Sequence, residues 1–245
     1  MSIKILINGA FGRMGQMTVK TISTHPGFEL VGQIGREYDL QKAIKDSHAQ
    51  VVIDFTHPES VFNNAYAIIE AGAHPVIGTS GLTLEQIRTL QDKCARMKLG
   101  GIIAPNFSLG AILMMKYAKE IVKYIPHVEI IEMHHDNKVD SPSGTALHSA
   151  EILGNSLAAT NQPLKASREI IPGARGATHH GIPIHAIRLP GFLAHQQIIF
   201  GHTGETLTLR HDSIDRQCFM PGVCLACEKV VKLEQLVYGL EEILE

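Results

Sequence analysis

The chain has 245 residues, 44% of them hydrophobic, and its 24 acidic and 22 basic side chains give a net charge of −2. This length and composition fit a globular protein of one large or two small domains and exclude a disordered chain. The charge balance offers no basic footprint for nucleic acid and no polybasic membrane patch, and no apolar run approaches the length of a spanning helix. We therefore expect neither nucleic acid nor a membrane as a partner.

The N-terminus and the cysteines favour a cytoplasmic protein. Asn8 and Arg13 interrupt the first apolar stretch, so the plan of a signal peptide is missing. Cysteines stand at positions 94, 218, 224 and 227. The spacing of Cys224 and Cys227 suits a redox or zinc motif, but zinc needs a second pair and a redox motif needs a strand-to-helix turn. We interpret both as reduced, half-buried thiols inside a helix.

A dinucleotide-binding turn is predicted at the start of the chain. Residues 2–8 are short, β-branched and apolar, as in a buried parallel strand. Gly9, Gly12 and Gly15 follow at once, and residues 16–24 have a helical pattern. Glycines between a strand and a helix let the backbone approach a pyrophosphate, although the spacing here is G-x-x-G-x-x-G and not G-x-G-x-x-G. The alternative is a purely structural turn.

The second strand should decide the cofactor. Residues 28–34 read as a strand, and Gly35-Arg36-Glu37 follows it. An acid at this point binds the ribose of NAD, whereas an Arg accepts the extra phosphate of NADP. We predict NADPH, with Arg36 on the 2′-phosphate, and Glu37 leaves NADH possible. The alternative for Arg36 is a solvated surface charge.

Three further apolar strands are expected at residues 50–55, 74–77 and 101–104. A helix at 60–72 follows the first, and another begins after the second with Thr83 as N-cap and Gln86 as its capping-box partner. Ligands of an open parallel sheet bind beyond the carboxyl ends of its strands. Residues 78–80 and 104–107 are therefore candidates to border the nicotinamide, unless they are ordinary helix starts.

The pattern changes in the second half of the chain. A long apolar helix is expected at residues 109–125. Strand-like runs and one helix follow, which indicates an α+β domain with a largely antiparallel sheet; the runs are 128–133, 184–188, 195–201 and 206–211, and the helix is 144–159. Residues 161–181 are rich in Gly, Pro and His and predict a loop. Residues 221–245 return to helix.

The segment 129–146 carries the chemistry. It brings together His134, His135 and Lys138, which can donate or shuttle protons near neutral pH. Ser143 is a plausible N-cap, so the N–H groups of Gly144 and Thr145 would be free to bind a carboxylate or phosphate. The pattern predicts proton transfer on a small acidic substrate. Two alternatives stay open: a surface histidine pair, and a metal site with ligands among His134, His135, Asp136 and Asp140.

Several segments together resemble the 4-hydroxy-tetrahydrodipicolinate reductase (dihydrodipicolinate reductase) family of lysine and diaminopimelate synthesis. The most specific is His134-His135 with Lys138 and Pro142-Ser-Gly-Thr145. The resemblance runs through nearly the whole chain; its other segments are residues 9–15, 54–56, 78–81, 104–108, 188–191, 195–196, 204–205 and 211–213, with Arg216, Phe219 and Gly222.

The resemblance implies an α/β architecture. Residues 1–107, completed by 217–245, would form a Rossmann-like dinucleotide-binding domain, and residues 108–216 a substrate-binding domain that builds a homotetramer. The implied reaction is NAD(P)H-dependent reduction of 4-hydroxy-2,3,4,5-tetrahydrodipicolinate, a dicarboxylic cyclic imine, to 2,3,4,5-tetrahydrodipicolinate.

The resemblance also implies roles for single residues. His134 would be the proton donor and acceptor, Lys138 a second proton donor, and His135, Gly144 and Thr145 substrate ligands, with no metal. The cofactor would be bound by Gly9, Ala10, Phe11, Gly12, Arg13, Met14, Arg36, Gly78, Thr79, Ser80, Ala104, Pro105, Asn106 and Phe107.

Three departures from the family pattern matter. Gly35 stands where an acid is common, Gln197 where Glu is common, and Ser141 where Ala is usual. The first favours NADPH over dual cofactor use, and the second leaves position 197 without a charge-based role. The rival functions are another two-domain nicotinamide dehydrogenase, such as one acting on an amino-acid semialdehyde, and a non-catalytic NAD(P)-binding protein. Neither rival needs the His134-His135-x-x-Lys138 segment.

Overall fold

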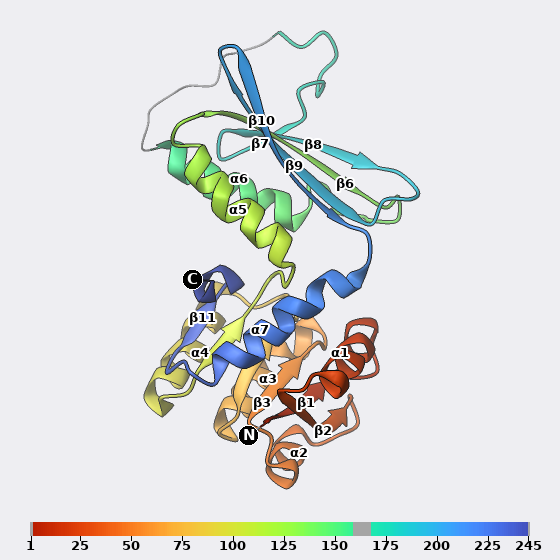
Figure 1. The fold of residues 1–245 in the computed structure, drawn as a ribbon, viewed down its shortest axis with the longest axis vertical. Coiled ribbons are helices and arrows are strands. Elements are labelled where there is room, and N and C mark those ends of the chain that lie inside the picture. Colours follow the sequence, from red (N-terminus) through yellow and green to blue (C-terminus); the bar gives the residue numbers. More distant parts are fainter. Residues whose placement is uncertain (1, 159–167, 245) are drawn as a thin grey trace. The chain divides into compact units, whose positions relative to one another are not determined.

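The computed structural model describes residues 2–158 and 168–244. The chain divides into two compact units (Figure 1): unit 1 is Met1–Leu109 with Arg216–Glu245, and unit 2 is Gly110–Asp215. These boundaries lie within three residues of the domain limits that the resemblance implies. Among the described residues, no helix combines the length and apolar character that crossing a membrane requires.

Unit 1 is built on a six-stranded parallel sheet in the order β11-β5-β4-β3-β1-β2. The strands are β1 Ile3–Asn8, β2 Phe28–Ile34, β3 Val51–Asp54, β4 His74–Ile77, β5 Gly101–Ile103 and β11 Leu236–Tyr238. Its helices are α1 Arg13–Thr24, α2 Leu40–Ser47, α3 Pro58–Glu70, α4 Leu84–Met97 and α7 Met220–Val230, with a short turn of helix at Arg216–Phe219 and another at Leu240–Ile243.

Helices cover both faces of this sheet (Figure 1). The apolar sides of α2, α3 and α4 form one continuous core with the strands of the sheet. Helices α1 and α7 contact each other, and each also contacts strands of the sheet. All four residues of β3 are buried, which explains why the central strands read as uninterrupted apolar runs. The predicted Rossmann-like parallel sheet is confirmed, and so is the Thr83–Gln86 capping box.

Two elements of unit 1 differ from expectation. The helix predicted over residues 221–245 ends at Val230, and the chain then adds the edge strand β11 beside β5. Leu236 is 3% exposed, so burial on the sheet edge outweighs the helical pattern; residue 245 lies outside the described chain. Helix α2 was not predicted, although the Asp39 carboxylate caps it by accepting from Lys42 N at 3.0 Å.

Unit 2 has a five-stranded mixed sheet in the order β10-β9-β6-β8-β7. The strands are β6 His127–His134, β7 Ala177–His179, β8 Ile182–Arg188, β9 Ala194–His202 and β10 Glu205–Ser213. Only the β6–β8 pair is parallel, so the expectation of a largely antiparallel sheet is confirmed for the described strands. The loop predicted at 161–181 was wrong at Ala177–His179, where β7 pairs with β8; residues 159–167 lie outside the description.

Helices α5 (Leu109–Ile121) and α6 (Gly144–Ala158) cover one face of this second sheet (Figure 1). Met114 and Ala118 of α5 and Ala146 and Ala150 of α6 are buried with Phe200 and other apolar residues of the strands. Helix α5 ends four residues before its predicted limit at 125. The packing fixes the start of α6 beside the end of β6, where the catalytic candidates lie.

Candidate functional site

A cleft of about 950 Å³ opens in unit 1 beyond the carboxyl ends of β1, β2, β3 and β4. This is the place where ligands bind to open parallel sheets, at the point where the strand order reverses. The predicted cofactor residues that line it are Gly9, Phe11, Gly12, Arg13, Met14, Arg36, Gly78, Thr79 and Ser80.

The glycine turn brings the backbone close to this cleft. Gly9 has a φ of +83°, and a Cβ there would lie 2.3 Å from the carbonyl oxygen of Phe55. A Cβ on Gly15 would lie 2.0 Å from the oxygen of Gly9, so α1 can pack directly on the turn only because this residue is glycine. Gly12 is the N-cap of α1 and supplies no side-chain cap. The helix therefore presents N–H donors to the cleft, as a pyrophosphate site requires.

Phe11 and Gly35 are paired at the rim of the same cleft. A Cβ built on Gly35 would lie 3.0 Å from the Phe11 ring, so the ring occupies the space that a side chain at position 35 would need. Arg36 and Arg13 line the cleft with exposed side chains, whereas Glu37 is not among its lining residues.

The remaining predicted cofactor residues lie behind or beside the described cleft lining. Ala10 is buried, and its N–H donates to Ile34 O at 3.0 Å. Ala104 and Phe107 are buried as well, Pro105 is exposed, and Asn106 Oδ1 accepts from Ser108 N at 2.8 Å. The rings of Phe107 and Phe55 meet edge to face across Gly78, where any Cβ would lie 2.1 Å from Phe55. Phe107 thus supports the wall that Gly78 forms.

Asp54 is a polar residue of this cleft region that the sequence analysis did not single out. It is fully buried at the end of β3, and its carboxylate accepts from Asn8 Nδ2 at 2.9 Å and Asn64 Nδ2 at 3.0 Å. The hydroxyl groups of Thr56 and Thr79 donate to it at 2.7 Å each. All four donors line the cleft. An acid at the end of an otherwise apolar strand was the signal that could have found it.

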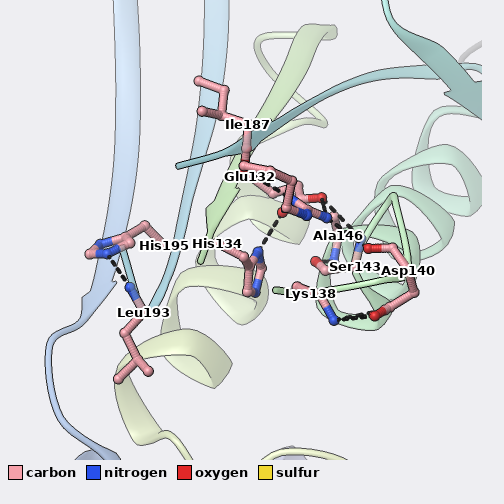
Figure 2. Close-up of polar contacts among 10 residues, drawn as sticks. Glu132, His134, Lys138, Asp140, Ser143, Ala146, Ile187, Leu193 and His195 are labelled. Atoms are coloured by element: carbon pink, nitrogen blue, oxygen red, sulfur yellow. Dashed lines mark hydrogen bonds and ion pairs between the residues drawn. The ribbon is translucent and has the colours of Figure 1, made fainter. Parts of the chain in front are cut away.

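The catalytic candidate His134 bonds to a second buried carboxylate, Glu132 on β6 (Figure 2). His134 Nδ1 lies 2.5 Å from Glu132 Oε2, and Arg188 of β8 donates to both oxygens, from Nη2 at 2.7 Å and Nη1 at 2.9 Å. The backbone N–H of Ser143 donates to Oε1 at 3.1 Å. Four donors therefore converge on one side chain that is 0% exposed.

These contacts determine which nitrogen of His134 carries a proton. Burial opposes ionisation of Glu132, but the hydrogen bonds from His134 and Arg188 outweigh it and hold the pKa of the carboxyl below its usual value. An ionised carboxylate only accepts hydrogen bonds, so His134 donates from Nδ1. Nε2 is then the nitrogen that can take up or release a proton.

Lys138 and Asp140 form an ion pair near this cluster (Figure 2). Lys138 Nζ lies 2.7 Å from both carboxylate oxygens of Asp140, and this hydrogen bond lowers the pKa of Asp140. Arg188 Nη2 also donates to the Asp140 carbonyl oxygen at 2.9 Å. The arginine thus connects the loop that carries Lys138 to the strand that carries His134.

The start of α6 carries the backbone N–H groups that were predicted to bind an anion. Ser143 Oγ accepts from Ala146 N at 3.2 Å, which confirms Ser143 as the N-cap. Gly144 is exposed, and within the described chain the N–H groups of Gly144 and Thr145 have no hydrogen-bond partner. The ring of His135 has none there either. A carboxylate can accept from such free N–H groups.

The metal alternative receives no support from the described side chains. No group of three His, Cys, Asp or Glu side chains within the described ranges can hold a metal ion.

His195, which lies on β9, has a hydrogen-bond partner at both ring nitrogens. Nδ1 lies 2.7 Å from Asp212 Oδ1, and Nε2 accepts from Leu193 N at 3.3 Å (Figure 2). It is therefore held as a structural histidine.

Cys224 and Cys227 lie in α7 of unit 1 as free thiols. Burial raises the pKa of both, so neither is poised as a thiolate nucleophile. Both lie within a helix as expected, but only Cys224 is half-buried, whereas Cys227 is fully buried.

The fold and the glycine-turn cleft define a nicotinamide-dinucleotide-binding oxidoreductase with a separate α+β unit. Models of the dihydrodipicolinate reductase N-terminus and C-terminus match residues 3–107 and 110–244. The chain therefore belongs to the dihydrodipicolinate reductase family, and the predicted family and enzyme class are confirmed.

Relatives and solved structures agree over the full length. The 4-hydroxy-tetrahydrodipicolinate reductases of Coxiella burnetii (strain Dugway 5J108-111) and Legionella pneumophila (strain Paris) are 55% and 50% identical, with 100% of both chains covered. The structure of a dipicolinate-bound dihydrodipicolinate reductase from Paenisporosarcina sp. TG-14 matches with a TM-score of 0.94 and 41% identity over 100% of each chain. GenD2 from gentamicin A biosynthesis, at 11% identity and a TM-score of 0.64 over 99% of this chain and 90% of its own, shares the fold alone.

Proposed function

We propose that the chain reduces 4-hydroxy-2,3,4,5-tetrahydrodipicolinate to 2,3,4,5-tetrahydrodipicolinate for lysine and diaminopimelate synthesis, with NADPH as preferred cofactor. The observation that carries this proposal is the cluster of unit 2, where an oriented imidazole, an ammonium and a helix N-terminus lie within residues 132–146 of a family member. The similar reductase from Paenisporosarcina sp. TG-14 is bound to dipicolinate, which supports a cyclic dicarboxylate as the ligand of this chain too.

The residues of unit 2 fit the substrate's charges. Its carboxylates would be bound by the N–H groups of Gly144 and Thr145 and by the ring of His135. A substrate carboxylate can also replace Asp140 at the ammonium of Lys138, since both make the same kind of charged hydrogen bond. Binding would then release Lys138 from its internal partner.

Proton transfer follows from the same geometry. A nicotinamide cofactor held in the unit 1 cleft would supply hydride chemistry. The residues of unit 2 would then have to balance the negative charge that hydride addition places on the neighbouring carbon and ring nitrogen, once the hydroxyl has left as water. Lys138, or His134 with a proton on Nε2, would stabilise that charge and deliver the one proton that the product needs. Glu132 holds Nδ1 protonated throughout, so the proton exchanged by His134 is the one on Nε2.

The cofactor preference rests on the rim of the unit 1 cleft. Arg13 and Arg36 are exposed there and can pair with phosphate groups, Arg36 with the 2′-phosphate. The Phe11 ring lies 3.0 Å from where a Cβ at position 35 would stand, so an acid that binds a free ribose diol would have to displace this ring. Replacing Arg36 by Ala should raise the NADPH KM about tenfold or more and leave the NADH KM unchanged. An unchanged NADPH KM would remove the assignment.

A double variant tests the Phe11–Gly35 pair. Phe11→Ala with Gly35→Asp makes space and adds a carboxylate, so the affinity for NADH should rise relative to NADPH. Gly35→Asp alone should weaken both cofactors, because the new side chain meets the ring.

The open face of the unit 2 sheet supports a homotetramer. Opposite α5 and α6, the strands carry partly exposed Ile131, Ile187 and Ile199, an apolar surface that association would bury. Light scattering should give a mass four times that of the 26.8 kDa chain, and Ile199→Asp should lower it. A chain that stays monomeric would exclude this assembly.

The free cysteines of the chain fit a reducing cytoplasm.

The activity itself is tested by NADPH oxidation with substrate generated in the assay. We expect the near-ultraviolet absorbance to fall only when substrate is present. A folded protein that binds NADPH and gives no decay above background would exclude the reaction and leave the non-catalytic alternative.

A further inference from the structure

The Glu132–Arg188 pair contacts the catalytic segment at three points. Glu132 bonds His134 at the end of β6 and the Ser143 N–H at the start of α6. Arg188 bonds Glu132 and the carbonyl oxygen of Asp140 between them. Residues 135–142, which include His135 and Lys138, are thus attached at both ends and in the middle to one ion pair.

Because Glu132 is buried, its hydrogen-bond partners cannot be exchanged for water. The Glu132 side chain is 0% exposed and that of Arg188 18% exposed, so the carboxylate has no water to replace a lost partner. The bidentate geometry fixes the plane of the carboxylate, and that plane directs one oxygen to His134 and the other to Ser143. Glu132 donates no proton to a ligand, because all its acceptor sites are turned inward to these four donors.

We propose that Glu132 and Arg188 are positioning residues of the reductase. Together they hold His134 with its proton on Nδ1, and they fix the relative positions of the His134 ring, the loop that carries Lys138 and the N-terminus of α6. The inference rests on the proposed function. Displacing a catalytic group by about 1 Å can cost on the order of 10²-fold in rate, so loss of the pair should act on kcat.

The first experiment replaces Glu132 by Gln. The amide keeps the side-chain volume, but its NH₂ must face at least one of the four donors. We expect kcat to fall about 10²-fold, while the dissociation constant of NADPH, measured by fluorescence, stays within about twofold because the cleft of unit 1 is untouched. Nitrogen-15 spectra should show His134 with Nδ1–H in the parent protein and with a substantial Nε2–H population in the variant.

The matched control is Glu129→Gln. Glu129 lies on the same strand, where it also binds a histidine and an arginine, His185 and Arg175, but on the opposite face. The same chemical change there should leave kcat within about twofold and the His134 resonances in place. His134→Gln identifies those resonances by their loss.

Arg188→Lys keeps the charge and loses the bidentate geometry, and it decides the matter if Glu132→Gln does not fold. It should lower kcat at least about tenfold and retain the Nδ1–H form of His134, because the ionised Glu132 remains. The inference is overturned if folded Glu132→Gln and Arg188→Lys both keep kcat within about threefold of the parent. It is also overturned if His134 has the same tautomer in Glu132→Gln as in the parent. Should the parent itself reduce no substrate, the reductase assignment fails, and the nitrogen-15 comparison still tests the positioning of His134.

Discussion

Strand β6 carries two clusters of the same composition on its opposite faces. Glu132 binds His134 and Arg188, and Glu129 binds His185 and Arg175. The side chains of the first cluster are 0, 14 and 18% exposed, and those of the second are 35, 28 and 51% exposed. In the isolated chain, the same three residue types are therefore a buried framework on the helix-covered face and a partly exposed ion-pair cluster on the open face.

The difference shows why the residue types alone do not identify a site. Water can replace any partner of Glu129, so its bonds contribute little to stability and hold its histidine loosely. Glu132 has no such replacement, and its partners are held at fixed positions. Among the residues that the structure describes, only the first cluster also adjoins a helix N-terminus and an ammonium.

The largest contrast is expected in catalysis. His134→Gln should lower kcat about 10²–10⁴-fold, because the group that exchanges a proton at Nε2 is lost. His185→Gln should leave kcat within about twofold. Steady-state kinetics at saturating NADPH measures both, and the NADPH KM should move little in either variant. Equal losses of kcat would contradict the assignment of chemistry to the Glu132 face.

Removing the carboxylate of Glu132 should lower the free energy of unfolding much more than removing that of Glu129. Glu132→Ala leaves Arg188 without its buried partner and should cost about 3–5 kcal/mol of unfolding free energy. Glu129→Ala should cost less than about 1 kcal/mol when measured at a concentration where the chain is monomeric, since its partners are then exposed to water. Urea unfolding followed by circular dichroism gives both values. A loss below about 1 kcal/mol for Glu132→Ala would show that its burial is not what distinguishes the clusters.

The pH dependence of stability sharpens the same comparison. The folded-state pKa of Glu132 lies below the unfolded value of about 4.3, so its stabilisation is complete above that value and is lost as pH falls through the folded pKa. The difference in unfolding free energy between the parent and Glu132→Gln should be full at pH 7 and shrink below about pH 4. The pKa of Glu129 is lowered too, against an opposing effect of burial. Its Gln variant should show the same trend with a smaller amplitude.

The smallest effect is expected at Asp140. Its ion pair with Lys138 has an exposed carboxylate, so Asp140→Asn should change the unfolding free energy by less than about 1 kcal/mol. Removing the internal competitor for Lys138 should lower the substrate KM a few-fold. A KM that rises would mean that Asp140 orients Lys138 for the substrate and does not compete with it.

Much of the site was predictable because short-range patterns encode it. A strand, a glycine turn and a helix in succession predict the dinucleotide cleft, and Ser143 before a helical run predicts the start of α6. The order of elements likewise predicts the parallel sheet, since alternating strands and helices can form little else. Besides the missed helix α2 and the early end of α5, the errors fell on β11 and β7, three-residue strands whose formation depends on pairing with a neighbouring strand.

The amino-acid sequence by itself determined the fold class, the family and the candidate residues of proton transfer, because periodicity and local motifs are properties of neighbouring positions. Tertiary structure alone decided which carboxylate bonds to His134 and sets the orientation of its ring. Glu132 and Arg188 are 56 positions apart and meet only because β6 and β8 pair in parallel. Glu129 and Glu132 have the same chemistry in the sequence, and only the helices that cover one face of the sheet make one of them a buried, oriented carboxylate.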